Sequence, residues 1–126
     1  IPGSSAEWLA RAQGDLALAN TSLPEGGFYE DLCFHAQQAA EKALKAVFMY
    51  HKLTFRYVHD LDELITGLKE GGIDVPKEVE EAIELSVYAY ETRYPGVSEP
   101  VTKEEYNRAV ELASRVVNWA QTQMNE

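Results

Sequence analysis

A spacing of apolar residues typical of helices runs through most of the chain, and its longest uninterrupted stretch is 28–52. This stretch, FYEDLCFHAQQAAEKALKAVFMYHK, contains neither Gly nor Pro. At about 100° per residue, one broad and mainly apolar face collects Leu32, Cys33, Ala36, Ala39, Ala40, Ala43, Leu44, Val47, Tyr50 and His51. The opposite face carries Asp31, His35, Gln38, Lys42 and Lys45, with Gln37 at the boundary. Because the alanines add little bulk, a neighbouring helix can approach closely. We therefore predict the central helix of an all-α bundle here.

Helices are also predicted on both sides of this stretch. The first begins at Ser4 or Ser5, because Ser4-x-x-Glu7 matches a capping box, and it ends at the breaker cluster 20–27. Residues 53–58 alternate apolar and polar side chains, but no second strand exists to pair with them, so we expect an extended connector. A short helix follows, with Asp60 as its N-cap, and runs to about Lys69.

Two more helices complete the predicted bundle. One opens at 74–76 and ends at Pro95-Gly96, and its predicted inner face is Val79, Ala82, Ile83, Ser86, Val87 and Tyr90. The last follows the capping box Thr102-x-x-Glu105 and runs to about Gln123. The fold class is thus all-α, an up-and-down antiparallel bundle of four long helices plus one short helix. We expect a single domain over 1–126, with residues 1–4 as a poorly ordered leader.

Charge and composition narrow the classes of function. The formal net charge is −10, and such a field repels phosphates, so a broad nucleic-acid surface is not expected. No apolar run approaches the roughly 20 residues that a membrane span needs. The single cysteine, Cys33, fits a reducing cytoplasm and is expected to be an inert buried thiol. These features predict a cytoplasmic protein that does not bind membranes.

The sequence contains no strong catalytic signature. GxxxxGKS/T, GxGxxG, GxSxG and HExxH are all absent. The histidines His35, His51 and His59 do not have metal-ligand spacing with acids or cysteines. We therefore predict no catalytic residue, no metal site and no resident cofactor, and whether the chain is an enzyme stays open.

Three places could still bind a ligand, and each also has a purely structural interpretation. The polar stripe His35, Gln38, Lys42 and Lys45 offers donors for an anion, or it is a solvated face with a Glu41–Lys45 pair. The stretch 56–60, Arg-Tyr-Val-His-Asp, could hold a phosphate or a base at a helix N-terminus, or it is a loop whose aspartate caps the helix. In 90–96, Tyr90 and Tyr94 flank Arg93, which either lines a cavity or locks a helix end.

Read together, three motifs resemble the HEPN domain family. They are FHAQQAAEKALKAV (34–47), His59-Asp60-Leu61-x-x-Leu64, and Thr92-Arg93-Tyr94-Pro95, in the order and approximate spacing of that family. The resemblance implies a helical bundle, commonly homodimeric, in the cytoplasm of a prokaryote. It also implies a nucleotide- or RNA-related role, often beside a minimal nucleotidyltransferase. The ligand-binding residues that it implies are Gln37, Gln38, Glu41, Lys42, His59, Asp60, Arg93 and Tyr94, to which the stacking argument adds Tyr90.

The chain departs from the RNA-cleaving members of this family. Those members look alike in carrying an Arg followed four to six residues later by a His, and neither Arg93, Arg108 nor Arg115 has such a partner. We therefore expect a non-nuclease module that binds a nucleotide or a nucleotidyltransferase partner. The alternatives are a protein-binding half of a toxin–antitoxin-like pair, with Phe34 as an interface anchor, and an RNase.

Overall fold

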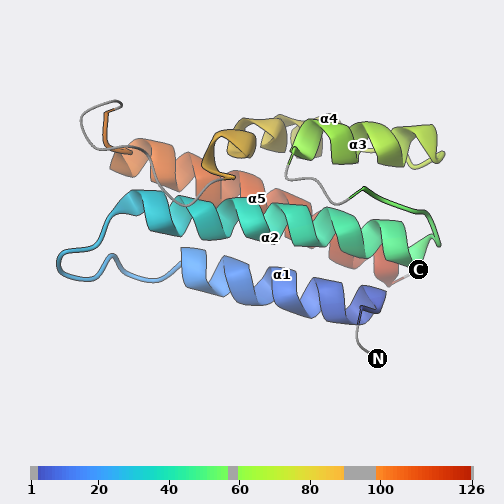
Figure 1. Ribbon diagram of the computed structural model, residues 1–126, viewed down its shortest axis with the longest axis horizontal. Coiled ribbons are helices and arrows are strands. Elements are labelled where there is room, and N and C mark those ends of the chain that lie inside the picture. Colours follow the sequence, from blue (N-terminus) through green and yellow to red (C-terminus); the bar gives the residue numbers. More distant parts are fainter. Residues whose placement is uncertain (1–2, 57–59, 90–98, 126) are drawn as a thin grey trace.

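The computed structural model describes residues 3–56, 60–89 and 99–125, and every regular element in these ranges is a helix. The elements are α1 (Ser5–Ala19), α2 (Tyr29–Tyr50), α3 (Leu61–Glu70), α4 (Lys77–Glu80), the 3-10 helix η1 (Glu81–Tyr88) and α5 (Lys103–Met124). Figure 1 shows the long helices α1, α2 and α5 lying side by side, with α3 and α4 along one flank. The predicted all-α fold class is confirmed. None of the described helices combines the length and apolarity that a membrane crossing requires.

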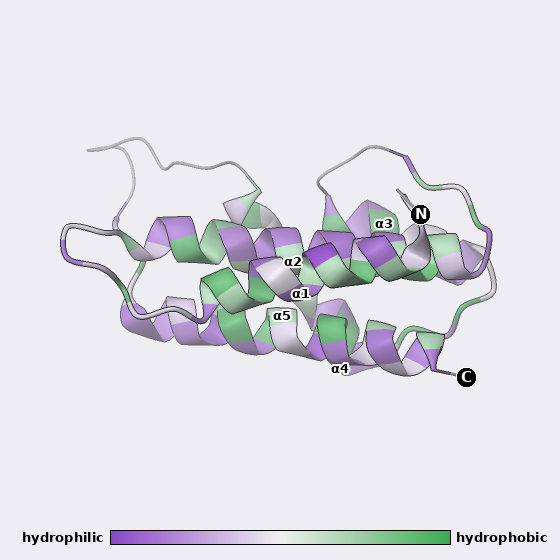
Figure 2. Cartoon of the chain, turned by 90° about the horizontal axis from the view of Figure 1, so that it is seen from below, coloured by the Kyte–Doolittle hydropathy of each residue, from purple (hydrophilic) through white to green (hydrophobic). Residues whose placement is uncertain are grey.

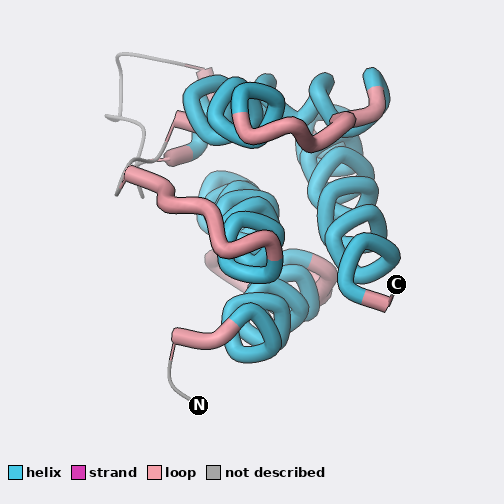
Figure 3. The backbone as a smooth tube through the Cα atoms, turned by 90° about the vertical axis from the view of Figure 1, so that its right-hand side faces the viewer, coloured by secondary structure: helices cyan, strands magenta, loops and turns pink. Residues whose placement is uncertain are grey.

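Helix α2 is the centre of the bundle, as predicted. It contacts α1, α3, η1 and α5, and the end-on view of Figure 3 shows the other helices arranged around it. Its alanines at 36, 39, 40 and 43 are wholly buried, because their small side chains let the neighbouring backbones come close. Figure 2 shows the matching bands of hydrophobic and hydrophilic residues along the helices. The apolar face ends earlier than predicted, since Tyr50 and His51 are exposed where the helix terminates.

Three of the predicted helix starts are confirmed by their capping contacts, whereas α4 begins after Pro76 with no side-chain cap. The Ser4 hydroxyl accepts a hydrogen bond from the Glu7 amide, and Asp60 accepts one from the Asp62 amide. At the start of α5, Thr102 and Glu105 form the complete reciprocal capping box. Residues 53–56 have no regular secondary structure, as expected of a connector, whereas 57–58 lie outside the described residues. So do the first two residues of the expected leader, 1–4.

The fourth helical segment differs from the prediction in its winding. It begins as α4 and continues as eight residues of 3-10 helix, although 3-10 runs beyond three or four residues are uncommon. Its buried residues are Val79, Ala82, Leu85 and Tyr88, which are spaced by three. The prediction that Ile83 and Val87 face inward is wrong, because they are 37% and 70% exposed. A winding of 3.0 residues per turn, instead of 3.6, brings every third residue to the same side.

This winding sorts α4–η1 into three rows, each with its own neighbour. The core row is Val79, Ala82, Leu85 and Tyr88. The α5 row is Glu78, Glu81 and Glu84, whose carbonyl or carboxylate oxygens accept hydrogen bonds from Arg108 and Arg115. The α3 row is Glu80, Ile83 and Ser86, in which Glu80 pairs with Lys69 and the Ser86 hydroxyl accepts from the Leu61 amide at 3.2 Å. The 3-10 geometry therefore lets the segment contact the core, α5 and α3 at the same time.

Candidate functional site

A row of polar side chains lies buried on α2 at four-residue intervals. The Gln37 amide donates to Glu41 Oε1 at 3.0 Å, and Lys45 Nζ lies 2.9 Å from Glu41 Oε2. Gln37 is 0%, Glu41 3% and Lys45 4% exposed, so the interpretation of the polar stripe as a solvated face is wrong for Lys45 and its partner Glu41. The predicted Glu41–Lys45 pair is present, but it lies within the protein. We call Gln37, Glu41 and Lys45 the buried polar row.

Two aromatic rings cover the lysine end of this row. Lys45 Nζ lies 5.6 Å from the centre of the Trp8 ring on α1 and 5.4 Å from that of Phe55 in the connector. The two rings meet edge to face with their centres 5.8 Å apart. An ammonium at this distance is attracted by the negative face of an aromatic ring. The rings therefore hold Lys45 in place and exclude water from its ion pair with Glu41.

The buried polar row reaches the half-buried side chain of Gln38 at its other end. Gln38 Nε2 donates to Gln37 Oε1 at 2.8 Å. A continuous hydrogen-bonded path therefore leads from Gln38 through Gln37 and Glu41 to Lys45. In such a path each polar group fixes the orientation of the next.

A second cluster joins α1 to α2 through Asp15. Its two carboxylate oxygens lie 3.1 Å from His35 Nδ1 and 2.6 Å from Lys42 Nζ. The carboxylate side chain is 11% exposed, whereas His35 and Lys42 are 34% and 28% exposed. Sequence reasoning missed Asp15. A signal was available, because Asp15 lies between Ala12 and Ala19 at helical spacing on the buried stripe of α1.

The structure brings some of the predicted site residues together and separates others. Gln37, Gln38 and Glu41 form one hydrogen-bonded path, while Lys42 belongs to the Asp15 cluster. Asp60 caps α3, and the nearby Arg56 pairs with Glu63 at 2.7 Å on an exposed surface. His59, Tyr90, Arg93 and Tyr94 lie outside the described residues. Both predictions for Arg93, that it lines a cavity or that it locks a helix end, therefore stay predictions.

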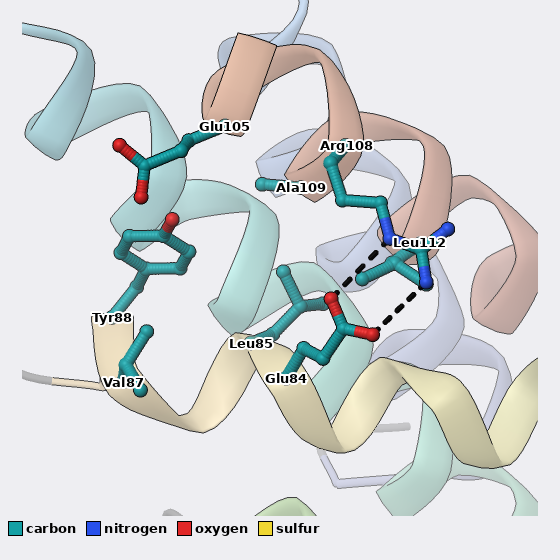
Figure 4. Close-up of a pocket in the computed structure, with 8 residues that line it drawn as sticks. All are labelled: Glu84, Leu85, Val87, Tyr88, Glu105, Arg108, Ala109 and Leu112. Atoms are coloured by element: carbon teal, nitrogen blue, oxygen red, sulfur yellow. Dashed lines mark hydrogen bonds and ion pairs between the residues drawn. The ribbon is translucent and has the colours of Figure 1, made fainter. Parts of the chain in front are cut away.

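A pocket of about 230 Å³ lies between η1 and α5, where the sequence predicted none. Figure 4 shows Leu85, Ala109 and Leu112 near one end, and Tyr88 pointing toward Glu105 at the other. Arg108 donates from Nη2 and Nε to the two oxygens of Glu84, at 2.9 and 3.3 Å. The hydrogen bond from Arg108 lowers the pKa of Glu84, and the same bond raises the pKa of Arg108. This charged pair therefore lines one side of the pocket.

Among residues 3–56, 60–89 and 99–125, no three histidine, cysteine or acidic side chains gather closely enough to hold a metal ion. Cys33 is buried, as predicted. The described clusters consist of amide, ammonium, imidazole and carboxylate groups that hydrogen-bond to one another, which is a chemistry of recognition and positioning.

Comparison with known proteins identifies the family. The model of the HEPN domain matches residues 5–123. The crystal structure of TT1696 from Thermus thermophilus is 32% identical, with a TM-score of 0.82 over 96% of this chain and 98% of that one. ST0689, described as an archaeal HEPN homologue, is 26% identical with a TM-score of 0.75 over the same shares of the two chains. A search of curated proteins gave no match. With a family model that spans nearly its whole length, this chain belongs to the HEPN domain family.

Proposed function

We propose that this HEPN protein is a nucleotide-binding module, working with a nucleotidyltransferase partner, and that Gln38 and Lys42 at the polar edge of α2 contact the ligand while the buried Gln37 and Glu41 hold Gln38 in position. The polar edge is Gln37, Gln38, Glu41 and Lys42. The observation that carries the proposal is the hydrogen-bonded path from the half-buried Gln38 to the buried Glu41–Lys45 pair. This path crosses a helix whose other buried positions are almost all apolar.

The cost of burying this path supports a functional role. A buried ion pair is often no more stabilising than well-packed apolar residues of similar volume. Stability alone therefore gives little reason to place Glu41 and Lys45 in the core. A fully hydrogen-bonded network does, however, fix the rotamer of the side chain at its outer end, here Gln38.

The donors at the edge suit the two parts of a nucleotide. A glutamine amide can donate to and accept from a base edge, and a lysine ammonium binds phosphate as a point charge. Gln38 and Lys42 stand four residues apart on α2, and neither is fully buried. We propose that Arg93 and Tyr94 contribute from the third family motif, as the resemblance implies.

Isothermal titration with ATP, GTP, CTP, UTP and their monophosphates tests the proposal. We expect saturable binding of at least one nucleotide at submillimolar concentration. Gln38→Ala, Lys42→Ala and Arg93→Ala should each weaken it about tenfold, the equivalent of about 1.4 kcal/mol. Lys103→Ala is the matched control, because Lys103 is an exposed lysine in the first turn of α5. Absence of binding up to millimolar concentration by the folded wild type would contradict the proposal.

A second candidate function is a protein-binding module, such as one half of a toxin–antitoxin-like pair or a homodimer. One observation favours it, because Val87 on η1 is an apolar residue that is 70% exposed. Phe34 is a weaker anchor than the sequence suggested, since it is half-buried with its ring edge to face with that of His35. Sedimentation equilibrium of the wild type and of Val87→Ser tests this function. A wild type that is monomeric at all concentrations, and that captures no protein partner in a pull-down, would contradict this function.

The RNase alternative receives no support from the described residues. An RNase needs a base or acid beside the scissile phosphate. The sequence contains no histidine after His59, so no arginine beyond that point can be followed by one.

A further inference from the structure

The residues of η1 could also adopt an α-helical winding, which would compete with the 3-10 helix. Its eight residues form a 3-10 helix, a geometry with poorer hydrogen bonds than the α-helix. Such a run persists only when contacts with neighbouring helices outweigh that disadvantage. Here these contacts are the burial of Leu85 and Tyr88 and the hydrogen bonds of the α5 row and the α3 row.

An α-helical winding of the same residues would present a different apolar face. The two windings differ by about 20° per residue, so they diverge by about 140° between Glu81 and Tyr88. Continued from α4 with α-helical spacing, Val79, Ala82, Ile83 and Ser86 point toward the core, whereas Leu85 and Tyr88 turn away. Ile83 is 37% exposed in the 3-10 winding and would become buried. The α winding therefore has an apolar face of its own, although it loses the larger side chains.

The charged contacts with α5 distinguish the two windings. Glu81 Oε2 lies 2.6 Å from Arg115 Nη1, and Glu84 is bound through both oxygens to Arg108. These two glutamates face the same helix because they are three residues apart, which is one full turn of a 3-10 helix. In an α winding they would diverge by about 60°. The 3-10 winding therefore aims both glutamates at α5, whereas an α winding would turn one of them away and weaken its ion pair.

We infer that residues 81–88 are a two-state segment, in which Arg108 and Arg115 select the 3-10 winding over an α winding that buries Ile83 in place of Leu85. The α winding is also shorter, by about 0.5 Å per residue or about 3.5 Å over the segment. A change of winding would thus rotate Tyr88 and Val87 and move the wall of the pocket between η1 and α5. This inference does not depend on the proposed ligand.

Backbone nuclear Overhauser contacts in the full-length protein test this inference. A 3-10 helix gives contacts from Hα of residue i to the amide of i+2, whereas an α-helix gives them to i+4. In the wild type we expect the first pattern over 81–88. In Arg108→Gln/Arg115→Gln we expect the i+2 contacts to weaken at least twofold and i+4 contacts to appear. Arg11→Gln, at an exposed position of α1, is the control and should match the wild type.

A third variant separates a change of winding from simple loss of structure. Adding Ile83→Ser to the double variant removes the apolar side chain that only the α winding buries, so the i+2 pattern should return. Three results would overturn the inference. They are an unchanged 3-10 pattern in the double variant, loss of both patterns with rapid amide exchange over 81–88, and i+4 contacts that persist after Ile83→Ser is added.

Discussion

Lys45 and Glu41 stand one helical turn apart on α2, with 2.9 Å between Nζ and Oε2, and both side chains are about 5% exposed. A pair with this spacing on a helix surface contributes only a few tenths of a kcal/mol and is screened by salt. Burial changes that, because each charge has lost its hydration and depends on its partner. Substituting either residue of this pair should therefore change the free energy of unfolding more than substituting an exposed charge does.

Removing the lysine charge alone should be costly. We expect Lys45→Met to lower the free energy of unfolding by about 3 to 5 kcal/mol, because Glu41 stays buried without its ammonium. Urea denaturation measures the free energy of unfolding. Urea is suitable because it is uncharged and does not screen the ion pair. Lys103→Met is the control at an exposed lysine and should change it by less than about 0.5 kcal/mol.

The double variant Glu41→Leu/Lys45→Met isolates the interaction between the two charges. We expect it to be more stable than the sum of the single effects predicts, by about 2 kcal/mol. Additive single effects would show that the ion pair contributes nothing beyond its separate contacts.

Asp15 should stabilise the packing of α1 against α2. We expect Asp15→Asn to reduce the free energy of unfolding by about 1 to 2 kcal/mol, because one carboxylate serves both His35 and Lys42. Asp74→Asn, at an exposed aspartate, is the matched control. Thermal and urea unfolding should agree on the difference. Equal stability of the two variants would mean that the Asp15 cluster does not contribute to the fold.

Two glycines within helices should respond differently to alanine. Nothing lies within 4 Å of a Cβ added at Gly14, so Gly14→Ala should stabilise α1 by about 0.5 to 1 kcal/mol. A Cβ at Gly67 would lie 3.0 Å from Cζ of the Phe48 ring. That contact should cancel the same gain in α3 or reverse it. Urea denaturation midpoints measure the stability of both variants. An equal gain at the two positions would show that Phe48 moves aside freely.

Tyr106 should stabilise the C-terminal end of α1 through its hydroxyl. The hydroxyl donates to the Ala19 carbonyl, and the ring stacks on Tyr29 at 4.9 Å. Tyr106→Phe keeps the stacking and removes the donor, so we expect a loss of about 1 kcal/mol.

The pKa of Tyr106 gives this prediction a pH dependence. Burial of the phenol is the main cause that raises its pKa above the ordinary value of 10.0. A raised pKa in the folded state contributes stability below that ordinary value, and this contribution is lost as the pH rises above it. Above about pH 10 the stability of the wild type should therefore fall faster than that of Tyr106→Phe. Parallel curves would show that Tyr106 is not the group responsible.

The glutamates of the α5 row should make the protein sensitive to acid. Hydrogen bonds from Arg115 and Arg108 are the largest causes that lower the pKa of Glu81 and Glu84 below 4.5. A lowered pKa contributes stability above the ordinary value, and this contribution is lost as the pH falls through the folded value. Between pH 5 and 3, Arg108→Gln/Arg115→Gln should thus lose less stability than the wild type. The difference should shrink in 1 M NaCl, where the Debye length is about 3 Å.

Much of the fold could be predicted from local chemistry. Ser4, Asp60 and Thr102 each have an oxygen suited to bind free amides at a helix start, and all three do so. The alanines of α2 required a close neighbour, whichever helix supplied it. Such features depend on a few adjacent residues, and the sequence contains them in full.

The burial of Lys45 could not be predicted in the same way. A helical wheel ranks positions by their own helix alone, and on that measure Lys45 faces solvent. It is buried because Trp8 of α1 and Phe55 of the connector after α2, neither of them on the same helix, meet over it. The candidate site consequently emerged as a network only once the tertiary packing was known.

The winding of η1 shows a missed signal of another kind. Glutamates at 78, 81 and 84 and apolar residues at 79, 82, 85 and 88 repeat every three positions. An assumed period of 3.6 instead selected Ile83 and Val87 as inner residues. The period of three is visible in the sequence, but only contacts with α3 and α5 make a long 3-10 helix favourable.

The three rows of α4–η1 also govern which changes in length the segment can tolerate. Inserting or deleting one residue moves every later side chain to a different neighbour, so that Glu84 after an insertion, or Ser86 after a deletion, would replace Leu85 in the core. A change of three residues adds or removes one complete turn and leaves each row in register. Homologous chains of this family that keep the same winding should therefore differ in length here by multiples of three.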